Sequence, residues 1–193
     1  MSSNSLHPLS NVTKSTHDQS PSLPTKPSEM SSNEFVAHFG ALYEHSPWIA
    51  SRVHELGVGP KQDNIDGLLA AFRLVLDQAD YDEKLGLICA HPDLAGKAAL
   101  SQSLTPDSTG EQASAGLDQC NADELRRFTD YNQSYKTKFG FPFIMAVRGS
   151  NRHEILSAFE TRLPNDKNTE FETAIREINK IAEIRLRAVF SDT

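Results

Sequence analysis

The residue with the clearest capacity for acid–base chemistry is His91. It stands directly before Pro92 in the stretch AHPDLAGKAALSQSLTPDSTGEQASAGLD, residues 90–118. The unperturbed pKa of histidine lies close to neutral pH, so an imidazole can both accept and donate a proton under ordinary conditions. A single histidine before a proline is also a common loop residue. The acid–base interpretation therefore needs other polar groups nearby.

Such groups follow on a short helix predicted over residues 105–118. Thr105 is a good N-cap, and Pro106 suits the first helical position, where its missing N–H costs nothing. At about 100° per residue, one face of this helix carries a hydroxyl, a carboxylate and an amide, those of Ser108, Glu111 and Gln112, with Ala115 beside them. This face predicts the wall of a small polar pocket, although Glu111 also fits a solvated carboxylate and Ser108 a residue that helps to cap the helix.

A third candidate lies on the last predicted helix, residues 167–189. The inward stripe of this helix is apolar and consists of Phe171, Ala174, Ile175, Ile178, Ile181, Ala182 and Val189. Arg185 falls on the same stripe, whereas Arg187 points in roughly the opposite direction. Because a lone buried charge is very costly, a guanidinium that faces the core must meet a carboxylate or another anion. The spacing therefore predicts an acidic or anionic feature in the interior, either a structural ion pair or part of a site.

The elements that must position these residues are predicted to be helices. Ser31 and Glu34 stand at capping-box spacing, and Ser46 before Pro47 can open the next helix. Helical spacing recurs in 31–43, 47–56, 65–76, 81–89, 105–118, 121–138, 150–162 and 167–189. The run 143–147 is the only strand-like segment and is predicted to be a buried extended segment or the start of a helix. The fold class is therefore all-α, a single-domain bundle of about eight or nine helices.

The composition is that of a globular domain preceded by a tail. The 193 residues are 38% hydrophobic and 23% charged, with a formal net charge of -7. This acidic balance argues against a nucleic-acid or anionic-membrane partner, and no apolar run approaches the roughly 18 residues of a membrane span. Residues 1–32 hold ten Ser, four Pro and no aromatic residue, which predicts a disordered tail before a domain of residues 33–193. Cys89 and Cys120 lack zinc-site spacing and predict free thiols in a reducing compartment.

Taken together, several multi-residue motifs resemble the OHCU decarboxylase (2-oxo-4-hydroxy-4-carboxy-5-ureidoimidazoline decarboxylase) family. They occur in family order over residues 33–190 and so cover the whole predicted domain. In this chain they read Tyr43-Glu44-His45-Ser46-Pro47-Trp48, His91-Pro92-Asp93-Leu94, Ser108-x-x-Glu111-Gln112 with Ala115-Gly116-Leu117, Asn132-x-x-Tyr135-x-x-Lys138-Phe139-Gly140-Phe141-Pro142-Phe143-Ile144, Arg148-Gly149, Arg162-Leu163-x-Asn165 and Ile181-Ala182-x-x-Arg185-Leu186.

The resemblance implies a carboxy-lyase of purine catabolism that decarboxylates OHCU to (S)-allantoin in urate degradation. It implies an all-α fold particular to this family, a homodimer, and a site that works without metal or organic cofactor. Three residues are matched to the catalytic site: His91, Glu111 and Arg185. Eight are matched to substrate binding: Pro92, Ser108, Gln112, Phe143, Ile144, Met145, Ala146 and Val147.

In this interpretation His91 is the acid–base group, acting first as a base or only as a proton donor. Glu111 holds the imidazole or the ureido nitrogens, and Arg185 neutralises Glu111 or the substrate anion. Ser108 and Gln112 bond to the ureido arm, while backbone groups of residues 143–147 read the edge of the ring. Loss of carbon dioxide leaves an electron pair that the adjacent ring C=N accepts, so no external electron sink is required.

Two other functions fit parts of the pattern. A non-catalytic helical interaction module would use the polar face of the 105–118 helix to meet a partner protein. A metal-dependent hydrolase would use His91, Asp93 and Glu111, although the sequence has no HExxH motif. The expected location is the cytoplasm, with the peroxisome as the alternative. Many eukaryotic members of the family end in a Ser-Lys-Leu type signal, whereas this chain ends Ser191-Asp192-Thr193.

Overall fold

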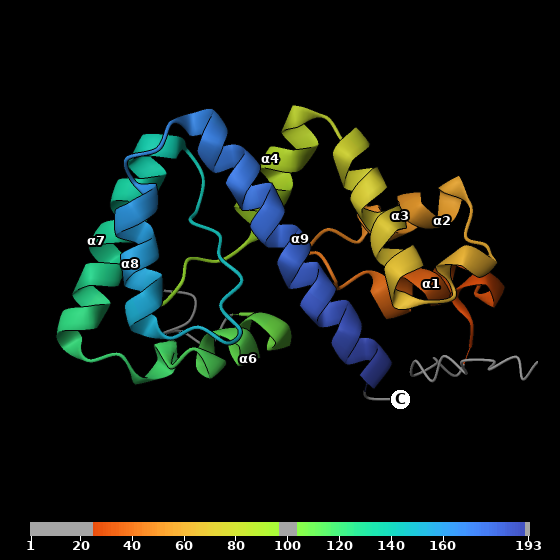
Figure 1. Ribbon diagram of the computed structural model, residues 1–193, viewed down its shortest axis with the longest axis horizontal. Helices are drawn as coiled ribbons and strands as arrows, with labels where there is room; N and C mark the ends of the chain where they lie inside the picture. Colours follow the sequence, from red (N-terminus) through yellow and green to blue (C-terminus); the bar gives the residue numbers. More distant parts are fainter. Residues whose placement is uncertain (1–24, 97–103, 192–193) are drawn as a thin grey trace, which may run out of the picture.

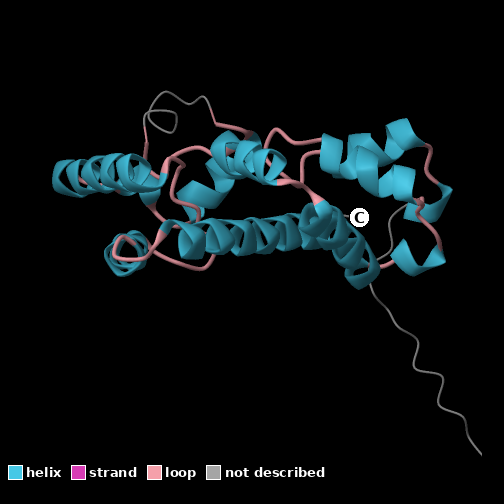
Figure 2. Ribbon diagram, turned by 90° about the horizontal axis from the view of Figure 1, so that it is seen from above, coloured by secondary structure: helices cyan, strands magenta, loops and turns pink. Residues whose placement is uncertain are grey.

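The computed structural model describes residues 25–96 and 104–191, and within these ranges the chain forms helices and loops but no strand (Figures 1 and 2). The elements in chain order are η1 (Pro27–Glu29), α1 (Ser32–Phe39), α2 (Trp48–Leu56), η2 (Pro60–Gln62), α3 (Ile65–Gln78), α4 (Tyr81–Ala90), α6 (Pro106–Ser114), η3 (Leu117–Gln119), α7 (Ala122–Phe139), α8 (Arg152–Arg162) and α9 (Lys167–Ser191), where η marks a short 3-10 helix. The predicted all-α fold class is confirmed. None of the described helices has both the length and the apolar character needed to cross a membrane.

The longest helix, α9, runs diagonally across the molecule and joins its two sides (Figure 1). The helices α1, α2 and α3 lie on one side of it, and α6, α7 and α8 lie on the other. The predicted inward stripe of α9 is buried apart from Val189, which is partly buried. Arg185 lies on this stripe and is only 6% exposed, so the inward position predicted from helical periodicity is confirmed.

Side-chain caps begin most of these helices. The capping box of Ser31 and Glu34 is present, and Thr105 caps α6 by accepting from the Ser108 N–H at 3.3 Å. The predicted cap at Ser46 is wrong, because Pro47 occupies the N-cap position of α2 and no side chain caps this helix. The helix predicted to reach residue 118 ends at Ser114, because Gly116 takes a left-handed conformation with φ 71°.

The packed domain begins before residue 33. Pro27 and Met30 are buried, and the backbone N–H and hydroxyl of Ser28 both donate to the carboxylate of Asp63, at 2.9 and 2.8 Å. The segment 27–30 therefore packs against the domain, although it falls within the predicted tail. Residues 1–24 lie outside the described part of the chain, so their predicted disorder stays a prediction.

The strand-like run 143–147 was predicted to be a buried extended segment or the start of a helix. In the structure it forms no helix and is extended. Arg162 holds it in place by donating from Nη1 to the Ile144 carbonyl at 2.6 Å. The guanidinium of Arg162 lies 4.3 Å from the centre of the Phe143 ring, which stacks on Phe159 at 3.8 Å. Arg162 is itself paired with Glu170, which is fully buried. The extended segment therefore has a fixed position beside α9.

Candidate active site

A small pocket with a cavity volume of about 30 Å³ lies between α4, α6, α9 and the 143–147 segment. The residues that line the pocket are His91, Pro92, Leu94, Ser108, Glu111, Gln112, Phe143, Ile144, Met145, Val147, Ile181 and Arg185. The three residues predicted to be catalytic thus share one hollow, and seven of the eight predicted substrate-binding residues line it too. Ala146 does not line it, and its N–H donates to Glu177 at 2.9 Å.

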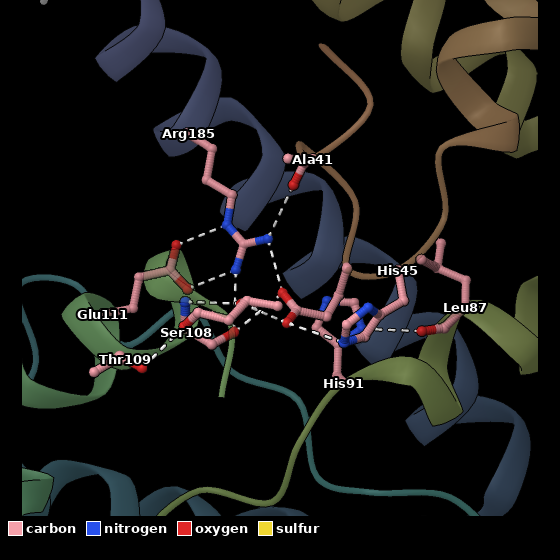
Figure 3. A network of polar contacts seen from close by, with 10 residues as sticks. Ala41, His45, Leu87, His91, Ser108, Thr109, Glu111 and Arg185 are labelled. Carbon is pink, nitrogen blue, oxygen red and sulfur yellow. Dashed lines mark hydrogen bonds and ion pairs between the residues drawn. The ribbon is translucent and has the colours of Figure 1, made fainter. Parts of the chain in front are cut away.

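His91 follows the last turn of α4 and is 8% exposed. Its Nδ1 bonds to the Leu87 carbonyl at 2.9 Å, one turn earlier (Figure 3). A carbonyl can only accept, so Nδ1 carries the proton and Nε2 of the neutral ring carries the lone pair. Nε2 is buried and has no hydrogen-bond partner among the residues described. The ring therefore offers an unused acceptor in the pocket.

Burial lowers the pKa of His91 to about 4, although the bond to the Leu87 carbonyl and the charge of Glu44 act in the opposite direction. The pKa of His91 therefore lies below that of an unperturbed histidine. The sequence could not show this, because the shift arises from the packing of the pocket around the ring. At neutral pH the imidazole of His91 is uncharged and is ready to accept a proton rather than to give one.

Arg185 reaches from α9 toward α6, where it meets Glu111 (Figure 3). Its Nε and Nη2 donate to the two carboxylate oxygens of Glu111 at 2.9 Å each. Two parallel bonds of this kind form the strongest pairing of a guanidinium with a carboxylate. The interior anion that the position of Arg185 requires is therefore Glu111. Arg185 was predicted to neutralise either Glu111 or the substrate anion, and the structure shows its contact with Glu111.

A second buried carboxylate, Glu44, also contacts Arg185 and was not predicted as a site residue. Glu44 is 2% exposed and accepts from Arg185 Nη1 at 2.9 Å, from the Ser108 hydroxyl at 3.0 Å and from the Thr105 hydroxyl at 2.7 Å. Burial by itself would raise the pKa of Glu44, but the Thr105 bond and the charge of Arg185 outweigh it, so the pKa lies below its usual value. Glu44 stands within the Tyr43–Trp48 motif, which was the only sequence signal for it.

Two side chains hold the loop that follows His91. Gln112 accepts from the Ala95 N–H at 3.0 Å, and Asn132 donates to the Leu94 carbonyl at 2.9 Å. Ala95 needs this support because its φ of 49° is unusual for a residue other than glycine. Gln112, which was predicted to bond to the ureido arm, therefore already has its amide oxygen engaged with the protein.

A sequence profile described as OHCU decarboxylase matches residues 28–187. The chain belongs to the OHCU decarboxylase family. The 2-oxo-4-hydroxy-4-carboxy-5-ureidoimidazoline decarboxylase of Haloferax volcanii is 38% identical over 159 residues, which are 82% of this chain and 90% of that protein.

Two solved structures have a similar fold. A crystal structure of (S)-allantoin synthase superposes with a TM-score of 0.66 and 32% identity, over 84% of this chain and 52% of that one. A crystal structure of OHCU decarboxylase in the presence of (S)-allantoin superposes with a TM-score of 0.60 and 28% identity, over 75% of this chain and 91% of that one.

The alternative of a metal-dependent hydrolase finds no support in the geometry. Among the residues described, no three His, Cys, Asp or Glu side chains lie close enough together to hold a metal ion. Asp93, the third proposed ligand beside His91 and Glu111, does not line the pocket and instead pairs with Lys136 at 2.6 Å.

Proposed function

We propose that this protein decarboxylates OHCU to (S)-allantoin in urate degradation, with His91 as the acid–base group. The observation that carries the proposal is the unpartnered Nε2 of a neutral His91 in a pocket shared with Glu111 and Arg185. Membership of the OHCU decarboxylase family supports the choice of substrate. A docking module for a partner protein would not require these three groups to meet in one pocket.

The chemistry follows from the name of the substrate, in which carbon 4 carries the hydroxyl and the carboxylate and carbon 5 carries the ureido arm. The bond from carbon 4 to the carboxylate breaks, carbon dioxide leaves, and the electron pair forms a double bond to carbon 5. The pair of the ring C=N moves onto nitrogen, which takes a proton. The hydroxyl then loses its proton as carbon 4 becomes a carbonyl, and carbon 5 gains one. One proton is consumed in total, and the ring serves as its own electron sink.

His91 suits the transfer between the hydroxyl and carbon 5. Because its ring is neutral, Nε2 first accepts the hydroxyl proton, and the resulting imidazolium then donates a proton to carbon 5. The bond from Nδ1 to Leu87 fixes the ring plane, so the proton reaches one face of the substrate and yields one enantiomer. General acid–base catalysis of this kind supplies roughly 10² to 10⁴ in rate.

The ureido arm has N–H groups that need acceptors. The Ser108 hydroxyl donates its proton to Glu44, and its oxygen accepts a long bond of 3.4 Å from Arg185 Nη2, so one lone pair is left to accept from the substrate. The carboxylate oxygens of Glu111 can accept in addition to their bonds with Arg185. Two of the backbone groups expected to read the ring edge have protein partners instead, the Ile144 carbonyl and the Ala146 N–H. Recognition by the 143–147 segment therefore relies on its side chains and its other backbone groups.

The test is to generate OHCU in the cuvette from urate and to follow dextrorotatory allantoin by circular dichroism, with and without this protein. Acceleration that survives thorough chelation supports a metal-independent decarboxylase. A rate of (S)-allantoin formation that does not rise with protein concentration would contradict the proposal.

We also propose that the protein works as a homodimer in the cytoplasm. The dimer is what resemblance to the family implies, and the free thiols of Cys89 and Cys120 suit a reducing compartment. Sedimentation equilibrium and cell fractionation test these two points. A monomer at micromolar concentration, or recovery with peroxisomes, would contradict them.

A further inference from the structure

Every N–H group of the Arg185 guanidinium is directed at an acceptor of the protein itself. Nε and Nη2 donate to the two oxygens of Glu111, and Nη1 donates to Oε2 of Glu44, each at 2.9 Å. The two remaining N–H groups donate at 3.4 Å, from Nη1 to the Ala41 carbonyl and from Nη2 to the Ser108 hydroxyl (Figure 3). A guanidinium has five donors in total. A substrate carboxylate can therefore bind Arg185 only by displacing one of these partners.

The charges of this group do not cancel. Arg185 contributes one positive charge, while Glu44 and Glu111 each contribute a negative charge. Glu44 accepts three hydrogen bonds, and Glu111 is held by two parallel N–H bonds, which is the arrangement of ionised carboxylates. The arginine–glutamate triad formed by these three residues therefore carries a net negative charge beside the pocket.

No other described side chain that lines the pocket supplies a cation, because burial keeps His91 neutral. Arg148, which follows Val147, and His45, whose Nε2 lies 4.0 Å from Glu44 Oε1, are both exposed and do not line the pocket. Two further cations on the neighbouring elements are paired with other groups. Lys136 pairs with Asp93 at 2.6 Å, and Arg162 is engaged by Glu170 and by the Ile144 carbonyl. An anionic substrate thus enters a site whose described charges sum to a negative value.

We propose that Glu44 is a positioning residue for decarboxylation, which withholds Arg185 from the substrate carboxylate and leaves that carboxylate unpaired. This inference rests on the proposed function. In the transition state the carboxylate loses its charge as it becomes carbon dioxide, and its electron pair moves into the ring. A cation paired with the carboxylate would stabilise the substrate more than the transition state and would slow the reaction. A negative neighbour has the opposite effect.

The direct test is E44Q, studied with OHCU generated from urate. Glutamine can keep its oxygen toward Arg185 and Ser108 while its amide faces Thr105, so the shape is retained and one negative charge is removed. Arg185 then attracts the substrate carboxylate more strongly. We expect KM for the anionic OHCU to fall about fivefold and kcat to fall about tenfold, while the affinity for neutral (S)-allantoin stays within about twofold. A merely structural role would weaken the binding of both ligands together.

Two variants serve as controls. E44D keeps the charge and should show no fall in KM for OHCU. Glu124→Gln removes another largely buried carboxylate, which bonds to Arg152 at 2.8 Å and does not line the pocket; it should leave both kinetic constants unchanged. If E44Q raises KM for OHCU, or leaves kcat unchanged, the inference is wrong. If the wild-type protein itself does not accelerate (S)-allantoin formation, it is the proposed function that fails.

Should E44Q not fold, the native protein decides the question by calorimetry. Hydantoin-5-acetate and hydantoin-5-acetamide have almost the same shape and differ in charge. A pocket of net negative charge should bind the acetamide at least about tenfold more tightly than the acetate. An acetate that binds as tightly as the acetamide would show that Arg185 is available to a ligand carboxylate and would overturn the inference.

Discussion

His91 differs from an ordinary histidine because of its place at the end of α4. The Leu87 carbonyl fixes the proton on Nδ1, and burial removes water from the ring. The charged form loses more from burial than the neutral form does, so the pKa falls to about 4. The same contacts leave Nε2 as an acceptor without a protein partner among the residues described.

The first prediction at this scale concerns His91→Asn. Asparagine retains a polar side chain but cannot shuttle a proton, so kcat for (S)-allantoin formation should fall by roughly 10² to 10⁴. The matched control is His38→Asn, because His38 bonds to a carbonyl one turn earlier on α1 in the same way but lies exposed. The control should retain full activity. A folded His91→Asn protein with the native rate would remove His91 from the chemistry.

The second prediction concerns the pH profile of kcat/KM. A base with a pKa of about 4 stays unprotonated well below neutral pH. We therefore expect kcat/KM to change by less than about twofold between about pH 5.5 and 7.5, whereas a histidine with an ordinary pKa would lose about tenfold over this range. Initial rates measured in overlapping buffers check this. A fall in kcat/KM at lower pH with an apparent pKa near 6.5 would mean that His91 is not buried as described or is not the base.

At the scale of the elements, the pocket depends on how α8 and α9 hold the 143–147 segment. Glu170 of α9 is fully buried and is bonded by Arg162, Tyr135 and Asn165. Arg162 also donates a hydrogen bond to the Ile144 carbonyl and so holds the 143–147 segment against this network. The segment has no strand partner in the described chain, so this buried network takes the place of a sheet.

The third prediction tests that network with Arg162→Lys. Lysine keeps the charge but lacks the planar fork, so it cannot bond to Glu170 and Ile144 together. The free energy of unfolding should fall by about 3 kcal/mol, because a buried carboxylate loses part of its pairing, and KM should rise as the pocket wall loosens. Urea denaturation and steady-state kinetics measure the two effects. Arg127→Lys, in an exposed pair with Glu160, is the control and should change neither quantity appreciably. Equal effects of the two substitutions would contradict this role of Arg162.

At the scale of the whole molecule, the buried groups of the site make stability depend on pH. The unfolded chain has a histidine pKa of about 6.5, above the value of about 4 in the folded protein. Protonation therefore favours the unfolded state as the pH falls from about 6.5 to about 4. The lowered pKa of Glu44 adds a contribution of the same sign below about pH 4.5.

The fourth prediction follows from this linkage. At about 1.4 kcal/mol per pKa unit, His91 should make the free energy of unfolding roughly 3 kcal/mol smaller near pH 4 than at pH 7. Urea denaturation across this range, compared with His91→Asn, isolates the contribution because the variant cannot take up the proton. Parallel pH curves for the two proteins would contradict a buried neutral His91.

Local patterns in the sequence were enough to predict the all-α fold class, the caps at Ser31 and Thr105, and the inward position of Arg185. Each depends on helical periodicity or on contacts within one turn, which act over a few residues of the chain. The sequence also predicted most of the pocket lining, because the family motifs carry it.

Only the tertiary structure shows which carboxylates bond to Arg185 and whether any of its N–H groups stay free for the substrate. Glu44 and Glu111 lie 141 and 74 residues away from Arg185 along the chain. Burial and contacts between distant segments likewise lower the pKa of His91, complete the set of partners around Arg185 and engage the Ala146 N–H with Glu177. Such contacts depend on how the helices pack, and no spacing within one helix contains that information.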